Sequence, residues 1–261
     1  MGQPTDSSPR EDPGVYGATA IAGQLAVIAL AACGRGDQSQ PDGTRADERF
    51  AAVERAVFAT DSASRIDAIA LEAAAVGPRR SFRARVISAR DGRLRFEQSF
   101  AGGETYVAAI GPSGAWEWDG RSPTVTPLSA AELSAVRGHD FLMLAVLPRT
   151  RLVFERLQDS VAFDLAPSWA AKCRDVLGAP LRIYYDGVTN LPLGYEVRNH
   201  NGTGAADVRA VFGPWTRQND HMVPRSVTLH QGTDRYEFTF TRIEPVTFSD
   251  SLVIPPRPFR R

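Results

Sequence analysis

The sequence contains very little lysine and cysteine. Of its 30 basic residues only Lys172 is a lysine, and 30 acidic residues balance them, so the formal net charge is zero. A neutral chain has no long-range field to attract nucleic acid, and we expect no nucleic-acid partner. The two cysteines, Cys33 and Cys173, allow one disulfide in an exported protein, but lipidation of Cys33 would leave Cys173 as a lone thiol.

Motifs for catalysis and for metal binding are also missing. The sequence has no HExxH and no CxxC pattern, and Gly111–Gly114 (GPSG) does not have the spacing of a G-x-S-x-G nucleophile elbow. No glycine-rich phosphate loop opens a predicted helix. We therefore expect no catalytic residues, no metal site and no cofactor, and we do not expect an enzyme. The four histidines, which we interpret as solvated or locally bonded, are His139, His200, His221 and His230.

The N-terminal region contains an uncharged, mostly apolar run from Val15 to Ala32. It ends in Leu30-Ala31-Ala32-Cys33, which resembles the lipobox of bacterial lipoproteins. We therefore interpret residues 1–32 as a lipoprotein signal peptide and residues 33–46, which are polar, as the lipidated Cys33 and a flexible tether. Two alternatives remain: a cleaved signal without lipid, or an uncleaved anchor, since 18 residues barely span ~30 Å of hydrocarbon.

Three segments predict helices. Thr44 and Asp47 have capping-box spacing, and apolar residues then recur at helical spacing to about residue 61. Ser129 and Glu132 form a second capping box. Residues 141–147 are apolar on nearly all sides and are followed by Pro148.

The rest of the chain alternates with period 2, as strands do. Ile69, Leu71 and Ala73 alternate with their neighbours, and Asp91-Gly92 is a strong hairpin signal. Later strand candidates include residues 151–156, 173–178, 181–185, 193–198, 208–212, 225–231 and 235–243. The predicted fold is mainly β (α+β): one large curved antiparallel sheet or incomplete β barrel, with about ten to eleven strands covered by two or three helices. Four arginines, which we expect on a solvated face, are Arg83, Arg85, Arg93 and Arg95.

This order of elements resembles the LolA/LolB family of periplasmic lipoprotein carriers. The resemblance covers roughly residues 47–256 and depends on layout and on diffuse local patterns. It is carried by Arg65–Leu71, by Trp116–Gly120 with its Asp-Gly turn, by Leu181–Arg198 and by the closing Asp250–Pro256. The expected phenylalanine between Leu252 and Pro255 is missing.

The resemblance implies a β domain over residues 47–261 with an apolar cavity that takes acyl chains of lipids or lipoproteins. It also implies a monomer in the bacterial cell envelope. The lipid on Cys33 would hold the protein at a membrane, where it would face the periplasm. We expect this to be the outer membrane rather than the inner one. A membrane anchor suits a protein that accepts cargo at a membrane better than a soluble protein that carries cargo across the periplasm. The alternative is a module of the same fold that senses or binds a protein partner in the envelope.

We assign the cavity to residues on the apolar faces of the middle helix and of the strands. An alternative is that the same residues fill a solid core. The predicted lining is Phe96, Phe141, Leu144, Leu147, Tyr185, Val197, Phe212 and Phe238.

Overall fold

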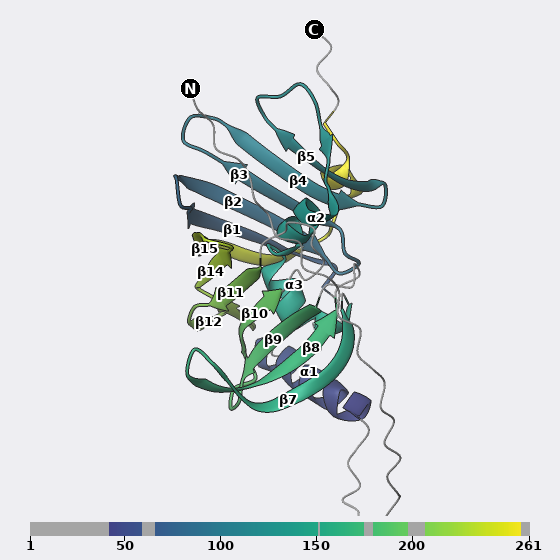
Figure 1. Cartoon of the computed structure of the whole chain (residues 1–261), viewed down its shortest axis with the longest axis vertical. Coiled ribbons are helices and arrows are strands. Elements are labelled where there is room, and N and C mark those ends of the chain that lie inside the picture. The colour runs from purple at the N-terminus through teal and green to yellow at the C-terminus, as the bar shows by residue number, and fades with distance from the viewer. Residues whose placement is uncertain (1–41, 59–65, 151, 175–179, 198–206, 257–261) are drawn as a thin grey trace, which may run out of the picture. The chain divides into compact units, whose positions relative to one another are not determined.

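A computed structural model of the chain describes residues 42–58, 66–150, 152–174, 180–197 and 207–256 (Figure 1). The chain divides into two compact units, residues 1–38 and 39–261, and every described residue belongs to the second. The predicted signal peptide, Cys33 and most of the predicted tether lie outside the described residues.

Within the described residues, thirteen strands form one antiparallel sheet that does not close into a barrel. Their order is β6-β5-β4-β3-β2-β1-β15-β14-β11-β10-β9-β8-β7, so β6 and β7 are the two edges, and β12 and β13 form a separate hairpin. The strands are β1 (Ala68–Val76), β2 (Ser81–Ala89), β3 (Leu94–Ser99), β4 (Thr105–Gly111), β5 (Gly114–Asp119), β6 (Thr126–Pro127), β7 (Val153–Phe163), β8 (Ala166–Arg174), β9 (Pro180–Asp186), β10 (Pro192–Val197), β11 (Val208–Phe212), β12 (Trp215–Gln218), β13 (His221–Pro224), β14 (Ser226–Gln231) and β15 (Asp234–Val246).

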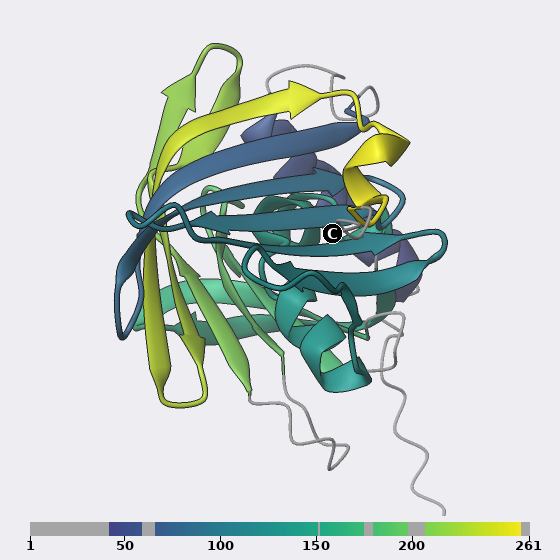
Figure 2. The same cartoon turned by 90° about the horizontal axis from the view of Figure 1, so that it is seen from above.

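The helices lie in the first part and the middle of the chain, as predicted. They are α1 (Asp42–Val57), α2 (Ala130–Arg137) and α3 (Phe141–Val146), with 3-10 turns η2 (Pro148–Thr150) and η3 (Asp250–Val253). Helix α1 packs against β7, β13 and α3, and α3 packs against β10. Figure 2 shows the curvature of the sheet around these helices. The predicted class, a large curved antiparallel sheet with helices, is therefore confirmed.

The sheet has more strands than the ten or eleven predicted. One strand of the sheet that was not predicted is β6, which has only two residues. The β12–β13 hairpin, which lies outside this sheet, was not predicted either, because its strands show no clear alternation of apolar and polar residues. Strand β8 contains Pro167, a residue that argues against a strand interior. Strand β7 reaches Phe163 because bulges between Phe154 and Arg156 and between Gln158 and Val161 keep it paired with β8.

The predicted helix ends are correct for α2 and differ from the observed ones for α1. The capping box at the start of α2 is confirmed: the Ser129 backbone amide donates to a Glu132 carboxylate oxygen at 2.7 Å, and the Glu132 amide donates to the Ser129 hydroxyl at 3.3 Å. Helix α1 begins at Asp42, inside the segment interpreted as tether, and ends at Val57 rather than near residue 61.

Part of the sheet is apolar on both faces. In β1, Ile69 and Leu71 belong to the main core, which includes the buried faces of the helices, whereas Ala68 and Ala70 belong to a second cluster on the opposite face. Residues of the C-terminal part cover this second cluster: the Trp116 indole Nε1 donates to the carbonyl of Val253 at 2.8 Å. Both faces of β1 are therefore buried from Ala68 to Leu71, whereas Ala74 and Val76 in its second half are exposed.

The prediction of a solvated arginine face is correct for part of the set. Arg83 is exposed, and 47% of the Arg85 side chain is exposed. The exposed fractions for Arg93 and Arg95 are only 20% and 19%, because η3 and its neighbours lie against them: Arg93 pairs with Asp250, and Arg95 donates to the carbonyl of Leu252 at 2.6 Å. For these two residues the prediction was wrong.

Candidate functional site

The structure brings all eight predicted cavity residues into one core. Each is buried, with 0–8% of its surface exposed. Their side chains pack on one another: the rings of Phe141 and Phe238 have centroids 5.1 Å apart. The hydroxyl of Tyr185 donates to the backbone carbonyl of Ala145 at 3.0 Å. The eight residues are therefore part of the buried core, and binding of a ligand among them stays a prediction.

An apolar cavity lies beside this core, on another face of α3. Its volume is about 160 Å³. Helix α3 contributes Leu142 and Val146, which are four residues apart and so lie on one face of the helix. The other apolar residues around it come from the end of α1, from the start of β1, from β13 and from the end of β15: Val57, Phe58, Ile66, Ile69, Met222, Val223, Ile243 and Pro245.

The sequence predicted that α3 is apolar all round, and the structure confirms that all six of its residues are buried. Phe141 and Leu144 were predicted to line the cavity, whereas Leu142 and Val146 were not. The i, i+4 spacing of the missed pair was visible, but the sequence does not say which face of such a helix meets the sheet and which meets the cavity.

Polar residues also line the cavity. Gln218, Asn219 and Asp220 come from the turn of the β12–β13 hairpin, and Glu244 comes from β15. His221 follows the turn, and its ring makes an edge contact with Phe58 at a centroid distance of 5.4 Å. A cavity lined mainly by apolar side chains with a few polar groups suits a ligand that is largely apolar.

Two buried polar groups mark the start of α3. The Ser88 hydroxyl donates to the Asp140 carboxylate. The neighbouring His139 ring stacks on Phe96 with centroids 4.1 Å apart, and its Nδ1 lies 3.1 Å from the carbonyl of Ala135. Burial lowers the pKa of His139 to about 4, so its imidazole is neutral at pH 7. These contacts join the α2–α3 corner to the sheet.

Burial also shifts the pKa of Cys173. Its thiol is free and buried, and burial raises its pKa to about 12, so it stays protonated. Across the described ranges, no cluster of three His, Cys, Asp or Glu side chains could hold a metal ion. None of the helices among these residues combines the length and the apolarity needed to cross a membrane.

Comparison with known proteins supports the fold. No protein-family model and no curated protein sequence matches the chain. Among solved structures, a LolA superfamily protein from Nitrosomonas europaea superimposes with a TM-score of 0.53 at 9% identity, over 80% of this chain and 97% of that one. A DUF1329 family protein from Desulfovibrio piger gives a TM-score of 0.54 at 11% identity, over 80% of this chain and 96% of that one. The LolA-like fold expected from the sequence is confirmed, and at these identities the similarity concerns the fold alone.

Proposed function

We propose that this protein is a bacterial envelope lipoprotein whose β domain binds acyl chains of lipids or lipoproteins in an apolar cavity. The observation that carries the proposal is the cavity between α3, β1, β13 and β15, lined mainly by aliphatic and aromatic side chains. The LolA-like fold supports it, since one similar structure belongs to the LolA superfamily. Acyl chains need only non-directional burial, so the function requires no catalytic group, cofactor or metal.

The size of the cavity sets a limit on its cargo. A cavity of ~150 Å³ lined by apolar residues holds one benzene molecule, and this cavity has about 160 Å³. As shaped, it takes a chain segment of roughly six carbons. A longer chain requires side chains to move. Met222 in the lining is well suited to this, because methionine is unbranched and adapts to irregular spaces.

The anchor proposed for this protein is the lipid on Cys33. Leu30-Ala31-Ala32-Cys33 supports it, and two or three acyl chains on a mature lipoprotein would hold it stably at a membrane. We place the β domain in the periplasm, with the outer membrane favoured over the inner, as a monomer that accepts cargo. Its partners are the acyl chains and the membrane.

The test is binding of an environment-sensitive fatty-acid probe to residues 34–261, which include the whole compact unit 39–261. Saturated fatty acids of 6 to 16 carbons then compete with the probe. Each buried methylene contributes ~0.8 kcal/mol, so affinity should rise about fourfold per carbon up to roughly six carbons. A continued rise beyond that length indicates that the cavity opens for long chains. Absence of probe binding would remove the carrier proposal.

One observation favours the alternative, an envelope module of the same fold that binds or senses a protein partner. The eight residues predicted to line a cavity belong to one cluster of buried side chains, which is also what a domain without a ligand cavity at this position would have. A protein that binds no acyl chain but is recovered from the envelope with one specific protein, in stoichiometric amount, would support this second function.

A further inference from the structure

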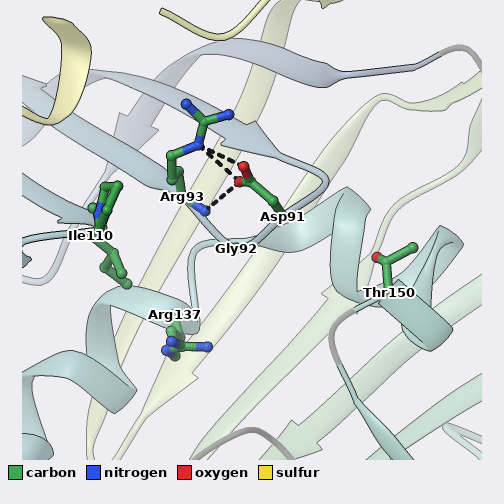
Figure 3. A pocket seen from close by; sticks show the side chains of 8 residues that line it. Asp91, Gly92, Arg93, Ile110, Arg137 and Thr150 are labelled. Atoms are coloured by element: carbon green, nitrogen blue, oxygen red, sulfur yellow. Dashed lines mark hydrogen bonds and ion pairs between the residues drawn. The ribbon is translucent and has the colours of Figure 1, made fainter. Parts of the chain in front are cut away.

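The charged residues that line a hollow of about 470 Å³ beside the β2–β3 turn already have partners. The Arg93 Nε donates to both carboxylate oxygens of Asp91, at 3.0 and 2.8 Å (Figure 3), and the same guanidinium pairs with Asp250. Arg137, which also lines the hollow, has a partner as well. Basic side chains without a carboxylate partner lie elsewhere, on the face of β7, β8 and β9 that points away from the main core.

Three basic residues stand directly opposite one another on these neighbouring strands. Arg156 of β7 pairs in register with Lys172 of β8, and Lys172 pairs in register with Arg182 of β9. Lys172 alternates with Ala171 and Cys173, which belong to the main core, so its side chain lies on the opposite, outer face. Directly paired residues share a face, with Cβ atoms ~5 Å apart. Arg156, Lys172 and Arg182 therefore form one line across the outer face, here called the basic row.

The two carboxylates beside the basic row are paired with other arginines. The Arg174 Nε donates to Glu155 at 2.5 Å, and Glu196 lies 3.5 Å from the Arg209 Nε. Within the described ranges, no ion pair joins a carboxylate to any member of the basic row. The row therefore keeps its positive charges next to carboxylates that are already shared.

The local contacts of the basic row do not remove its charge. Arg182 donates to the hydroxyl of Tyr184 at 3.3 Å, which is an uncharged group. Burial lowers the pKa of Lys172, and the positive charges of Arg156 and Arg182 lower it further, whereas Glu155 acts in the opposite direction. Like charges directly opposite each other in a sheet are destabilising, so an anion bound across the row would relieve this repulsion.

The surface beside the basic row has room for such an anion. A hollow of about 250 Å³ is lined by Lys172 and Arg182 together with the paired carboxylates Glu155 and Glu196. Arg156 is exposed on the neighbouring strand. A guanidinium matches two oxygens of a phosphate with its planar fork, and a lysine ammonium binds the same group as a point charge. The chemistry of the row therefore suits phosphate groups.

The start of α1 lies close to the basic row, at the β7 edge of the sheet (Figure 1). Arg45 in the first turns of α1 pairs with Asp159 of β7, and Asp159 follows Arg156 by three residues, which corresponds to about 10 Å along a strand. Nine residues lead from Cys33 to Asp42, where α1 begins, and they can span at most ~30 Å. A lipid on Cys33 would thus keep this edge of the sheet within reach of the membrane surface.

We propose that the basic row binds the phosphate groups of anionic lipids at the surface of the membrane that holds the protein. This inference rests on the lipid anchor in the proposed function, and it specifies which face of the β domain meets the membrane. An anchor on a tether leaves the domain free to turn. Basic side chains near an anionic surface add to the attraction, so the row would turn the β7 edge and the outer face beside it towards the lipid head groups.

The experiment measures sedimentation of residues 34–261 with vesicles. These residues contain the whole compact unit 39–261 and carry no lipid, so binding reports on the protein surface alone. The vesicles are pure phosphatidylcholine, or phosphatidylcholine with about one-third phosphatidylglycerol. Each basic residue at an anionic surface strengthens binding about fivefold, so the row predicts about tenfold or greater preference for the anionic vesicles. The preference should decrease between about 0.1 and 0.5 M salt.

Combined substitution of the row, Arg156→Gln with Lys172→Gln and Arg182→Gln, should remove the preference for anionic vesicles. Lys172→Gln alone should weaken binding to them about fivefold. Because each change removes a repulsion between like charges, the free energy of unfolding in urea should stay the same or rise. If the triple variant fails to fold, Lys172→Gln and the salt dependence of the parent decide the question.

The matched control removes three positive charges from other parts of the surface. Arg83→Gln, Arg217→Gln and Arg225→Gln are combined in one protein, and all three side chains are exposed. This variant has the same net charge as the triple variant of the basic row. It should keep the preference for anionic vesicles, which separates the row from the overall charge of the protein.

The outcomes separate this inference from acyl binding in the cavity. Equal binding of the parent to both kinds of vesicle, or equal losses in the two triple variants, would overturn the inference and leave acyl binding standing. Absence of fatty-acid probe binding would remove the carrier proposal without changing the vesicle preference. Displacement of the protein from anionic vesicles by an equal concentration of glycerol phosphate would show a site for a free phosphate and overturn the membrane as its ligand.

Discussion

The hydroxyl of Tyr195 in β10 donates a 2.6 Å hydrogen bond to the carbonyl of Gly138, at the corner between α2 and α3. The Tyr195 side chain is fully buried, and burial raises its pKa well above the usual value. Tyr185 in β9 makes the equivalent contact with Ala145 near the end of α3. Two strand tyrosines therefore hold the ends of α3 against the sheet and fix the helix that separates the filled core from the apolar cavity.

Tyr195→Phe should lower the free energy of unfolding by about 1–2 kcal/mol, because it deprives the buried Gly138 carbonyl of its Tyr195 donor. Urea unfolding followed by circular dichroism measures this change. Tyr236→Phe is the control, since Tyr236 is only partly buried, and it should change stability by less than about 0.5 kcal/mol. Equal effects of the two substitutions would contradict the role given to the Tyr195 hydroxyl.

Stability should depend on pH through His139. Its pKa is about 4 in the folded protein, against an ordinary value of 6.5, so between these values the unfolded chain binds a proton that the folded chain does not. Stability therefore falls as the pH falls from 6.5 towards 4, by about 2 kcal/mol from this one group between pH 6.5 and 5.

His139→Phe tests this dependence, because phenylalanine can keep the stacking on Phe96 and cannot take up a proton. Its free energy of unfolding should fall less steeply than that of the parent between pH 6.5 and 5. The same slope in both proteins would show that His139 is not responsible for the acid sensitivity.

Much of the sheet could be predicted from the sequence because the relevant signals are local. The alternation of Ile69, Leu71 and Ala73 predicts one buried face for β1, and Asp91-Gly92 predicts the β2–β3 turn. The second apolar cluster could not be predicted in the same way. It depends on Trp116 meeting Val253, a contact between residues 137 apart in the sequence, and the same long-range packing covers Arg93.

The candidate site was predicted less well for a physical reason. Apolar residues such as Phe141 and Leu144 can be recognised as buried, and the structure confirms this. Whether a buried residue meets another side chain or an empty space depends on how several elements pack together. The cavity at Leu142 and Val146 is such a space, and it includes residues of the β12–β13 hairpin, whose strands were not predicted.

The thiol of Cys173 should be unreactive in the folded protein. It is 2% exposed and has a pKa of about 12, and only the thiolate attacks alkylating or disulfide reagents. In residues 34–261, where Cys173 is the single cysteine, a colorimetric disulfide reagent at pH 8 should label almost nothing without denaturant and one thiol per chain in guanidinium chloride. Rapid labelling of the folded protein would contradict the buried position.

Cys33→Ser tests the anchor. If Cys33 carries the lipid, the variant should leave the membrane fraction or remain as the uncut precursor, and fractionation with intact-mass measurement distinguishes these results from the lipidated parent. Cys173→Ser, the matched control, should stay in the membrane fraction with its lipid. A Cys33→Ser protein that remains membrane-bound at its mature mass would contradict the lipoprotein interpretation.

The last prediction concerns the cavity. Val146→Phe places a phenyl ring against a space of about 160 Å³, and a cavity of ~150 Å³ is filled by one benzene. We expect the affinity for the fatty-acid probe to fall at least tenfold while the free energy of unfolding stays within about 1–2 kcal/mol of the parent value. Fluorescence titration measures the first quantity and urea unfolding the second.

The controls for Val146→Phe separate loss of binding from loss of fold. Val188→Phe makes the same substitution at a position that is 88% exposed and should bind the probe as the parent does. Leu144→Glu should lose both binding and stability, because residue 144 is buried in the apolar core and an unpaired carboxylate there is costly. If Val146→Phe is folded and binds the probe as tightly as the parent, the cavity at α3 is not the acyl site. Probe binding then has to be explained by space opening among the core residues, and without such space the protein-partner function is the one that remains.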